Sequence, residues 1–333
     1  MKKDLSIVIV SYNSEKYLSS CLDSIYNQKI GFSLEVIIFD NNSADNSVEL
    51  VKNKYSKAIL LKSTENIGFA MANNKAVEKC TSNKIFLLNP DTKLEVGALE
   101  ILFETLHKNY SERKILVPMQ LGYDDKKFLN CGLGLDVFGF PINEGTDKKF
   151  FYADGAAIFM YKKDFISLGM FDEGLFMIME DIDLSWKARL LGVSLERVKN
   201  AVIYHKSGHA IGTGGRETDG FSTTLFRRYH GEKNIIRNEL KNYSLLNLIW
   251  VLPINLLINL SETTLFLLLG KRELALVYVR AYIWNIKNIR DTLKKRSWIQ
   301  SRRVVGDSSI INSMYKGSAR LKLLLEAGVP RVK

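Results

Sequence analysis

The first hundred residues alternate short apolar runs with segments in which apolar side chains recur at helical spacing. The apolar runs have the length of buried strands and lie at residues 5–10, 34–39, 58–61 and 85–88. The segments of helical spacing or composition between them lie at residues 18–26, 48–51 and 68–80. Because strands alternate here with helices of this size, the pattern predicts an α/β fold with a mostly parallel sheet and helices on both faces.

Beyond residue 110 the sequence pattern changes to glycine-rich loops, interrupted by short apolar runs at residues 156–161 and 201–204. A helix is predicted at residues 183–191, because its apolar residues recur at helical spacing and Gly192 is suited to end it.

The last third contains a nearly continuous apolar stretch at residues 245–269, broken by Pro253 and by three asparagines. A membrane span needs about 20 predominantly apolar residues. The first part, residues 245–260, is only 16 residues long and holds all three asparagines. The pattern therefore favours two shorter helices that lie in a membrane interface or pack as a hairpin, rather than a clean crossing.

Charge separates the same last third from the rest of the chain. Residues 227–333 carry 20 Lys and Arg against 7 Asp and Glu, a net charge of +13, whereas residues 1–226 carry 27 against 29, a net charge of −2. This asymmetry suggests a polyanionic partner, either a nucleic acid or an anionic membrane surface. Apolar helices beside clusters of Lys and Arg favour the membrane surface. A soluble helical subdomain or an oligomerisation surface with a solvated basic face is the alternative.

The cysteines and the N-terminus indicate a reducing compartment. Cys21, Cys80 and Cys131 are scattered and form no Cys-x-x-Cys pair, so neither a disulfide framework nor a zinc site is expected. The apolar run at residues 5–10 is shorter than a signal-peptide core and is predicted to be a buried strand. The expected location of the first part of the chain is the cytoplasm.

Polar residues follow three of the predicted strands, at residues 11–13, 40–42 and 89–91. In sheets of this kind ligands bind outside the carboxyl ends of the strands. Asp40 can accept a hydrogen bond from a nucleobase or a ribose hydroxyl, or make a local turn. Asp91, in Asn89-Pro90-Asp91, can bind a hard cation such as Mg²⁺ or Mn²⁺, or belong to a proline turn.

Three acids lie within the segment 180–183, after an apolar and aromatic stretch at 171–179. A carboxylate in such surroundings can have a raised pKa and act as a general base, whereas the structural alternative is a helix cap. His205 follows the predicted strand at 201–204, close to His209, and is able to bind the same metal as Asp91. The small residue in Asp154-Gly155 allows a sugar to approach the backbone, so this pair is a candidate acceptor contact.

These motifs, in this order, resemble the family-2 glycosyltransferases of the GT-A fold, from Ser6 to about His209. In this resemblance, Val8–Asn13 corresponds to the family's first strand and nucleotide-binding loop, and residues 40–43 correspond to the turn that binds the nucleobase. Residues 66–74 correspond to the segment that passes under the diphosphate. Residues 89–91 correspond to the metal-binding motif, and residues 171–192 correspond to the segment that carries the catalytic base. Asn89 stands where the family usually has the first Asp of Asp-x-Asp, which leaves the role of residue 89 open. The motif at 89–91, with the base segment and the run from Tyr229 to Asn238, most resembles rhamnosyltransferases.

The resemblance implies that Asp181 is the catalytic base and that Asp91 and His205 bind Mn²⁺ or Mg²⁺. It implies donor contacts at Val10, Tyr12, Asn13, Asp40, Asn42, Asn66, Gly68, Asn73, Asn89 and Asp91, and acceptor contacts at Asp154, Gly155, Glu180 and Arg189. The implied donor is a nucleotide sugar, with dTDP-L-rhamnose ahead of UDP- and GDP-sugars. The implied acceptor is a glycan or a polyprenyl-diphosphate-linked sugar. Because one base and no second nucleophile are evident, a single inverting displacement is expected.

The chain is accordingly divided into a catalytic domain at residues 1–215 and a basic helical region at 216–333. The catalytic domain has a nucleotide-sugar half at 1–110 and an acceptor half at 111–215. The expected location is the cytoplasmic face of the cell membrane, and a homo-oligomer is left open.

Three other classes compete with this interpretation. A sugar-nucleotide pyrophosphorylase would carry a glycine-rich phosphate loop near the N-terminus, but residues 11–16 contain no glycine. A nucleic-acid partner is not expected, because the predicted crevice is acidic and no binding motif is evident. A non-catalytic relative would not need Asp40, Asp91 and Asp181, all of which are present.

Overall fold

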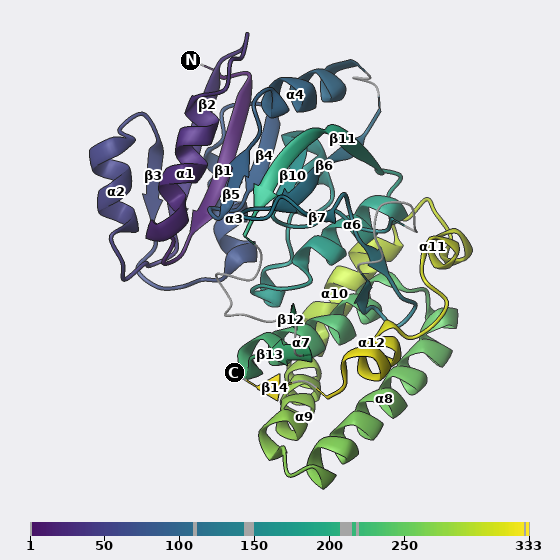
Figure 1. The fold of residues 1–333 in the computed structure, drawn as a ribbon. Coiled ribbons are helices and arrows are strands. Elements are labelled where there is room, and N and C mark those ends of the chain that lie inside the picture. The colour runs from purple at the N-terminus through teal and green to yellow at the C-terminus, as the bar shows by residue number, and fades with distance from the viewer. Residues whose placement is uncertain are drawn as a thin grey trace.

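The computed structural model describes residues 2–108, 112–142, 150–206, 215–217, 220–329 and 331–332. Within this part of the chain a nine-stranded sheet has the order β3-β2-β1-β4-β10-β6-β11-β5, with β7 paired to β6 (Figure 1). Its strands are β1 Leu5–Ser11, β2 Leu34–Asp40, β3 Ile59–Lys62, β4 Lys84–Leu88, β5 Thr92–Leu94, β6 Lys114–Gly122, β7 Phe128–Asn130, β10 Ala157–Tyr161 and β11 Ser194–His205. The four strands predicted in the first hundred residues are confirmed.

The sheet is mixed, with most strands in one direction. The strands β3, β2, β1 and β4 pair in parallel, and β6 pairs in parallel with β11. The strand β10 lies between β4 and β6 and is antiparallel to both, while β5 and β7 are antiparallel to their neighbours. The mostly parallel sheet is therefore confirmed, with three antiparallel strands that the sequence pattern did not indicate.

Helices cover both faces of the sheet, as the alternation of strand residues requires. On β1, Ile7 and Ile9 face one cluster, to which α1 (Glu15–Tyr26), α2 (Ser47–Lys54) and α4 (Ala98–Lys108) contribute. Val8 and Val10 face the opposite cluster, to which α3 (Phe69–Lys79), α5 (Lys162–Ser167) and α6 (Glu180–Leu190) contribute. The helix predicted at 183–191 thus begins earlier than expected, so its three acids lie in its first turn rather than before it.

A helical region packs below the sheet in Figure 1. It contains α7 Leu225–Asn242, α8 Leu245–Leu268, α9 Arg272–Lys287, α10 Ile289–Gln300, α11 Asp307–Ser313 and α12 Ala319–Ala327. A shared apolar cluster, which includes Trp186 of α6, Ile235 of α7 and Val251 of α8, joins this region to the sheet domain. Short elements complete the fold: β8 Gly134–Leu135, β9 Pro141–Ile142, η1 Glu173–Leu175, β12 Gly215–Glu217, β13 Gly220–Thr223 and β14 Arg331–Val332.

The prediction of two short helices within residues 245–269 is wrong. The helix α8 is continuous over 24 residues with Pro253 inside it, and α9 follows after a short turn. At about 1.5 Å per residue it is about 36 Å long. The asparagines do not interrupt it, because Asn255 donates to Glu239 of α7 at 2.8 Å and Asn259 to Tyr282 of α9 at 3.0 Å. By length and composition α8 is the one helix among the described residues that could cross a membrane.

Two predicted features lie outside the described residues: the boundary between residues 110 and 111, and His209. The division between the catalytic domain and the C-terminal region at residues 215 and 216 stays a prediction.

Candidate active site

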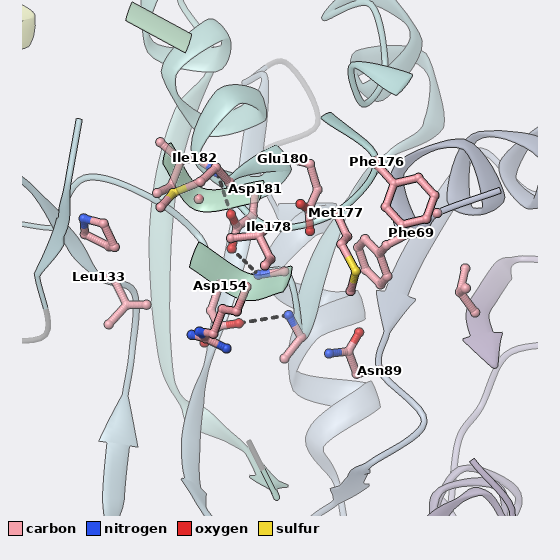
Figure 2. Close-up of a pocket in the computed structure, with 18 of the residues that line it drawn as sticks. Phe69, Asn89, Leu133, Asp154, Phe176, Met177, Ile178, Glu180, Asp181 and Ile182 are labelled. Carbon is pink, nitrogen blue, oxygen red and sulfur yellow. Dashed lines mark hydrogen bonds between the residues drawn. The ribbon is translucent and has the colours of Figure 1, made fainter. Parts of the chain in front are cut away.

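A cavity of about 870 Å³ lies at the edge of the sheet where the strands β1 and β4 end. It is bounded by the first loops of the chain, by the start of α6, and by residues of α7 and α12. The predicted site residues that line it are Val10, Tyr12, Asn13, Asn66, Gly68, Asn89, Asp91, Asp154, Gly155, Glu180, Asp181 and His205. Figure 2 shows Asn89, Asp154, Glu180 and Asp181 around the same space. The structure therefore brings most of the predicted donor, metal and base residues into one cavity.

Four predicted site residues are not among those that line the cavity. Asn73 donates to the Phe69 carbonyl within α3 at 2.9 Å, and Asn42 is exposed at a left-handed turn position with φ of 66°. Arg189 donates to the carbonyls of Phe150 and Phe151 at 2.8 and 2.7 Å, and so holds the segment before Tyr152. These contacts are structural, and the predicted roles of the three residues in ligand binding stay predictions.

Asp40 is the fourth, and it is buried at the end of β2. Its Oδ2 accepts from the Ser43 backbone N–H at 3.3 Å, which is the local turn that the sequence left open. Its Oδ1 is buried and has no hydrogen-bond partner among the described residues. Buried carboxylate oxygens without a partner are uncommon, so contact with a nucleobase stays a prediction for this residue.

Two loops carry predicted donor contacts, one after β2 and one before α3, and we call this part the donor side of the cavity. Hydrogen bonds of a side-chain amide join the two loops. Asn41 Nδ2 donates to Asn66 Oδ1 at 2.9 Å, and Asn41 Oδ1 accepts from the Ile67 backbone N–H at 2.9 Å. Gly68 follows with φ of 83°, and a Cβ there would lie 2.5 Å from the ring of Phe176. Only glycine fits this conformation and approach, which places the donor loop directly against the segment that leads to α6.

Asp91 and His205 are brought together by strand pairing. The strand β5 begins directly after Asp91 and pairs with the end of β11, so that Thr92 lies opposite His205. His205 Nε2 lies 3.4 Å from Asp91 Oδ1, and both side chains are buried. His205 Nδ1 lies 3.0 Å from Gln120 Oε1. A ring that donates from Nδ1 to this oxygen presents the Nε2 lone pair to the cavity beside Asp91.

This pair fits a divalent cation whose remaining ligands come from a diphosphate. A carboxylate oxygen and an imidazole nitrogen 3.4 Å apart can both reach one ion at bond lengths of about 2.1 Å. The described residues hold no group of three or more metal-binding side chains. Burial opposes protonation of His205, but the hydrogen bond and charge of Asp91 outweigh it and raise the pKa of the ring. The same carboxylate thus favours either a proton or a cation at Nε2.

Asp181 has the geometry and electrostatics of a general base. Its Oδ2 accepts from the Gly155 backbone N–H at 3.0 Å and its Oδ1 from the Ile182 N–H at 2.8 Å, as the dashed lines in Figure 2 show. Burial, followed by the charge of Asp154, raises the pKa of Asp181 to about 7. A base with a pKa near the working pH combines a useful ionised fraction with a strong affinity for the proton.

The neighbouring Glu180 differs from Asp181. Burial, followed by the charge of Asp181, raises the pKa of Glu180 well above its usual range, and its Oε2 has no hydrogen-bond partner among the described residues. Glu180 is therefore expected to be protonated when Asp181 is ionised. This difference in environment makes Asp181, rather than Glu180, the candidate for the predicted base.

The backbone before α6 is held in an unusual conformation. Phe176, Ile178 and Met179 have φ between 67° and 70°, a backbone conformation that residues other than glycine and asparagine rarely adopt. Asn234 of α7 donates to the carbonyls of Leu175, Met177 and Ile178 at 3.0, 3.0 and 2.6 Å, and Asn238 donates to that of Met179 at 3.0 Å. The helix α7 thereby fixes the loop that delivers Asp181 to the cavity.

Several residues of this site carry no local signal in the sequence: Gln120, Asn130, Tyr152, Arg227, Asn234 and Asn238. Asn130 donates to Asp154 Oδ2 at 3.0 Å and orients it. Gln120, Asn130, Asn234 and Asn238 act through partners far along the chain, which no local pattern marks. The run from Tyr229 to Asn238 was noted only as a family marker, although it contains Asn234 and Asn238.

Residues 6–128 match the family model described as "Glycosyl transferase family 2". This stretch of the chain has the sequence of a glycosyl transferase family 2 domain. The match covers the donor side of the cavity and Asp91, while Asp181 and His205 lie beyond it.

Named relatives match this chain mainly over a stretch of similar length. Chondroitin synthase of Escherichia coli is 34% identical over 109 residues, which cover 32% of this chain and 16% of that protein. The minor teichoic acid biosynthesis protein GgaA of Bacillus subtilis is 33% identical over 106 residues, 30% of this chain and 24% of that protein. The low-salt glycan biosynthesis hexosyltransferase Agl10 of Haloferax volcanii is 25% identical over 207 residues, 59% and 64% respectively. The chain spans less than two thirds of the length of each.

Solved structures share the fold over most of the chain. GalNAc-T7 with UDP, GalNAc and Mn²⁺ superposes with a TM-score of 0.55 and 15% identity, over 72% of this chain and 48% of that chain. S. aureus TarS 1-349 in complex with UDP-GlcNAc superposes with a TM-score of 0.54 and 18% identity, over 84% and 79% respectively. These likenesses confirm the predicted GT-A fold.

Proposed function

We propose that this chain transfers a sugar from a nucleotide-diphospho-sugar to a glycan acceptor in a single, inverting displacement. The observation that carries the proposal is the oriented Asp181 carboxylate, with a pKa of about 7, in the same cavity as the Asp91–His205 pair. One side of the cavity suits a leaving diphosphate with its cation, and the other suits a hydroxyl that must lose a proton.

The chain's own residues have distinct roles in this mechanism. Asp181 accepts the proton of the acceptor hydroxyl as the hydroxyl attacks the anomeric carbon, while Gly155 and Ile182 hold its carboxylate in place. Asp91 and His205 would hold Mn²⁺ or Mg²⁺, which supplies positive charge to the leaving diphosphate. The UDP and Mn²⁺ in the GalNAc-T7 structure support this assignment. Attack opposite the leaving group inverts the configuration of the sugar.

We further propose dTDP-L-rhamnose as the donor, supported by the motifs at 89–91 and 229–238. The UDP complexes among the structural neighbours favour a UDP-sugar as the alternative. A thermal-shift panel of dTDP-, UDP- and GDP-sugars with Mn²⁺ tests both. One donor is expected to raise the midpoint by several degrees, since a ligand at 100 Kd contributes about 2.7 kcal/mol. If no nucleotide sugar stabilises the chain or is consumed with any acceptor, the proposed function is wrong.

The proposed acceptor is a lipid-linked or cell-surface glycan, and the proposed location is the cytoplasmic face of the membrane. Relatives named for teichoic acid synthesis and for poly(ribitol-phosphate) glucosylation support a cell-wall or surface glycan. We place the donor and base chemistry in residues 1–215, although Phe226, Gly231 and Leu323 of the C-terminal region also line the cavity.

The outward face of α8 supports contact with a membrane. The residues that α8 buries include Asn255, Asn259 and Glu262, whereas Leu257 and Leu260 are 63% and 52% exposed. A helix of a soluble protein normally has the opposite arrangement, with its apolar stripe inside. The basic clusters contribute less than the charge count suggests, because Lys295, Arg296 and Arg303 bind Asp172, backbone carbonyls and Asp307 within the fold. The membrane contact is therefore proposed for the apolar face.

Vesicle flotation tests this contact. Replacing Leu257 and Leu260 together by glutamate is expected to lower partition into vesicles with anionic lipid by about 100-fold or more, because each buried leucine contributes about 1.5–3 kcal/mol. Val96→Glu is the matched control, since Val96 is 72% exposed in the turn between β5 and α4. Equal flotation of both variants and the wild type would exclude α8 as the membrane contact.

A further inference from the structure

One arginine of α7 differs from every other basic residue of that helix. The others are all engaged: Arg228 with Glu232 and Glu262, Lys233 with the carbonyls of Gly174 and Leu175, Arg237 with Asp172 and Asp291, and Lys241 with Asp172 and Asp183. Among the described residues, the guanidinium of Arg227 has no hydrogen bond or ion pair. It is nevertheless partly buried and lines the cavity. The guanidinium therefore lines the cavity with no counterion from the described part of the chain.

Arg227 interacts through its charge with Tyr152, a buried phenol that also lines the cavity. Burial raises the pKa of Tyr152, the charges of Asp181 and Asp154 raise it further, and Arg227 opposes them. The backbone of Tyr152 pairs with that of Leu133, which directly precedes β8, and Pro141 and Ile142 of β9 also line the cavity. Charge interactions link His205 to Asp91 and Asp154, Asp154 to Asp181, both of these carboxylates to Tyr152, and Tyr152 to Arg227.

The start of α7 adds to the positive field at this point. Thr224 caps the helix by accepting from the Arg227 backbone N–H at 3.1 Å, and Thr223 and Phe226 line the cavity with Arg227. The 18-residue helix directs the positive end of its dipole to the same region. Arginine at such a site favours phosphoryl oxygens, which it binds through two parallel N–H groups.

We propose that Arg227 and the hydroxyl of Tyr152 form a subsite for a phosphoryl group of the acceptor, separate from the diphosphate of the donor. This inference rests on the proposed function, because it uses Asp181 to define the acceptor side. The phosphoryl group belongs either to a prenyl diphosphate that carries the growing sugar or to a phosphodiester within a polymer. An acceptor of either kind places its hydroxyl at Asp181 while its phosphate contacts Arg227.

Calorimetry with the full chain, Mg²⁺ and two probes tests the subsite. The probes are geranyl diphosphate, for a prenyl-linked acceptor, and a short polyol-phosphate oligomer, for a polymer. Arg227→Gln is expected to weaken binding of one probe by about 10- to 100-fold, the range for a charge-assisted hydrogen bond, and Arg227→Lys by less. The probe that responds identifies the source of the phosphate. Arg290→Gln is the matched control, because Arg290 is exposed on α10.

Two further measurements separate the acceptor from the donor. Asp91→Asn is expected to leave binding of the responsive probe within about 2-fold, because the metal pair serves the other phosphate site. Arg227→Gln is expected to leave the affinity for the free nucleotide unchanged. Equal weakening of nucleotide binding would assign Arg227 to the donor and overturn the proposal, as would failure of both probes to bind the wild type. Failure of the proposed function shows separately, as the absence of any nucleotide sugar that binds or turns over.

Discussion

Asp181→Asn is expected to lower kcat by about 10²- to 10⁴-fold, which is the contribution typical of a positioned general base. Asparagine keeps the size of the side chain and one acceptor oxygen for the Gly155 or Ile182 N–H, but it cannot take a proton from the acceptor hydroxyl. Binding of the nucleotide sugar should survive, because the donor loops and Asp91 are unchanged. Turnover and donor affinity, measured on the same preparation, give the two values.

Glu180→Gln is the matched control for this variant. Glu180 is buried, and its raised pKa keeps it neutral, so an amide closely resembles the protonated carboxyl. A modest loss of kcat is expected. Near-complete activity of Asp181→Asn together with inactivity of Glu180→Gln would reverse the assignment of the base.

The same assignment predicts the pH dependence. Asp181 must be ionised to act, and its pKa is about 7, so kcat/KM is expected to rise with pH and to level off above that value. Removing the negative charge of Asp154, in Asp154→Asn, should move this limb to lower pH, since Asp154 is the second cause of the raised pKa after burial. An unchanged limb in that variant would mean that another group controls the profile.

Asp91→Asn is the second substitution with a large expected effect. It removes the carboxylate that faces His205 at 3.4 Å, and hence one of the two side chains proposed to hold the cation beside the diphosphate. We expect kcat/KM to fall by at least about 100-fold and the Mn²⁺ concentration for half-maximal activity to rise, because several kcal/mol of charge stabilisation are lost. Initial rates over a Mn²⁺ titration measure both effects.

The control for this experiment is Asp23→Asn, an exposed acid of α1 that pairs with Lys54. It changes the net charge by the same amount but lies outside the cavity, so its metal dependence should match the wild type. His205→Gln should shift the metal dependence in the same direction as Asp91→Asn. Wild-type metal dependence in both site variants would rule out Asp91 and His205 as the metal pair.

The sequence located the elements of the sheet domain well because the relevant signals are local. Apolar runs of strand length and polar residues directly after them are properties of neighbouring residues, and Asp91 and Asp181 occur within such short motifs. The order of β10, β5 and β7 in the sheet was not available in this way. Antiparallel pairing of β10 with β4 joins segments about 70 residues apart, and nothing in either strand specifies its neighbour.

The helix α8 shows where a local argument led to a wrong prediction. Its asparagines and Pro253 resemble breaks when only the sequence is considered, so two shorter helices were expected. In the fold, Asn255 and Asn259 find partners on α7 and α9, and their burial leaves the leucines outside. Whether a polar residue interrupts a helix depends on whether a neighbour satisfies it, and that neighbour is chosen by tertiary packing.

The sequence by itself determined the class of fold and the resemblance to family-2 glycosyltransferases, and it predicted the acids of the site, because residue type and spacing carry that information. Only the tertiary structure decided which distant residues contact and orient those acids. It brings Gln120 into a hydrogen bond with His205, although the two are 85 residues apart in the sequence. It also lets Asn234 donate to the Ile178 carbonyl in the loop before Asp181, 56 residues away in the sequence. It also pairs Arg228 with Glu232, whereas Arg227 in the cavity has no ion-pair partner in the part of the chain that the structure describes. Hydrogen bonds and charges act over a few ångströms in space, so only the folded chain establishes which distant residues orient, neutralise or leave open a reactive group.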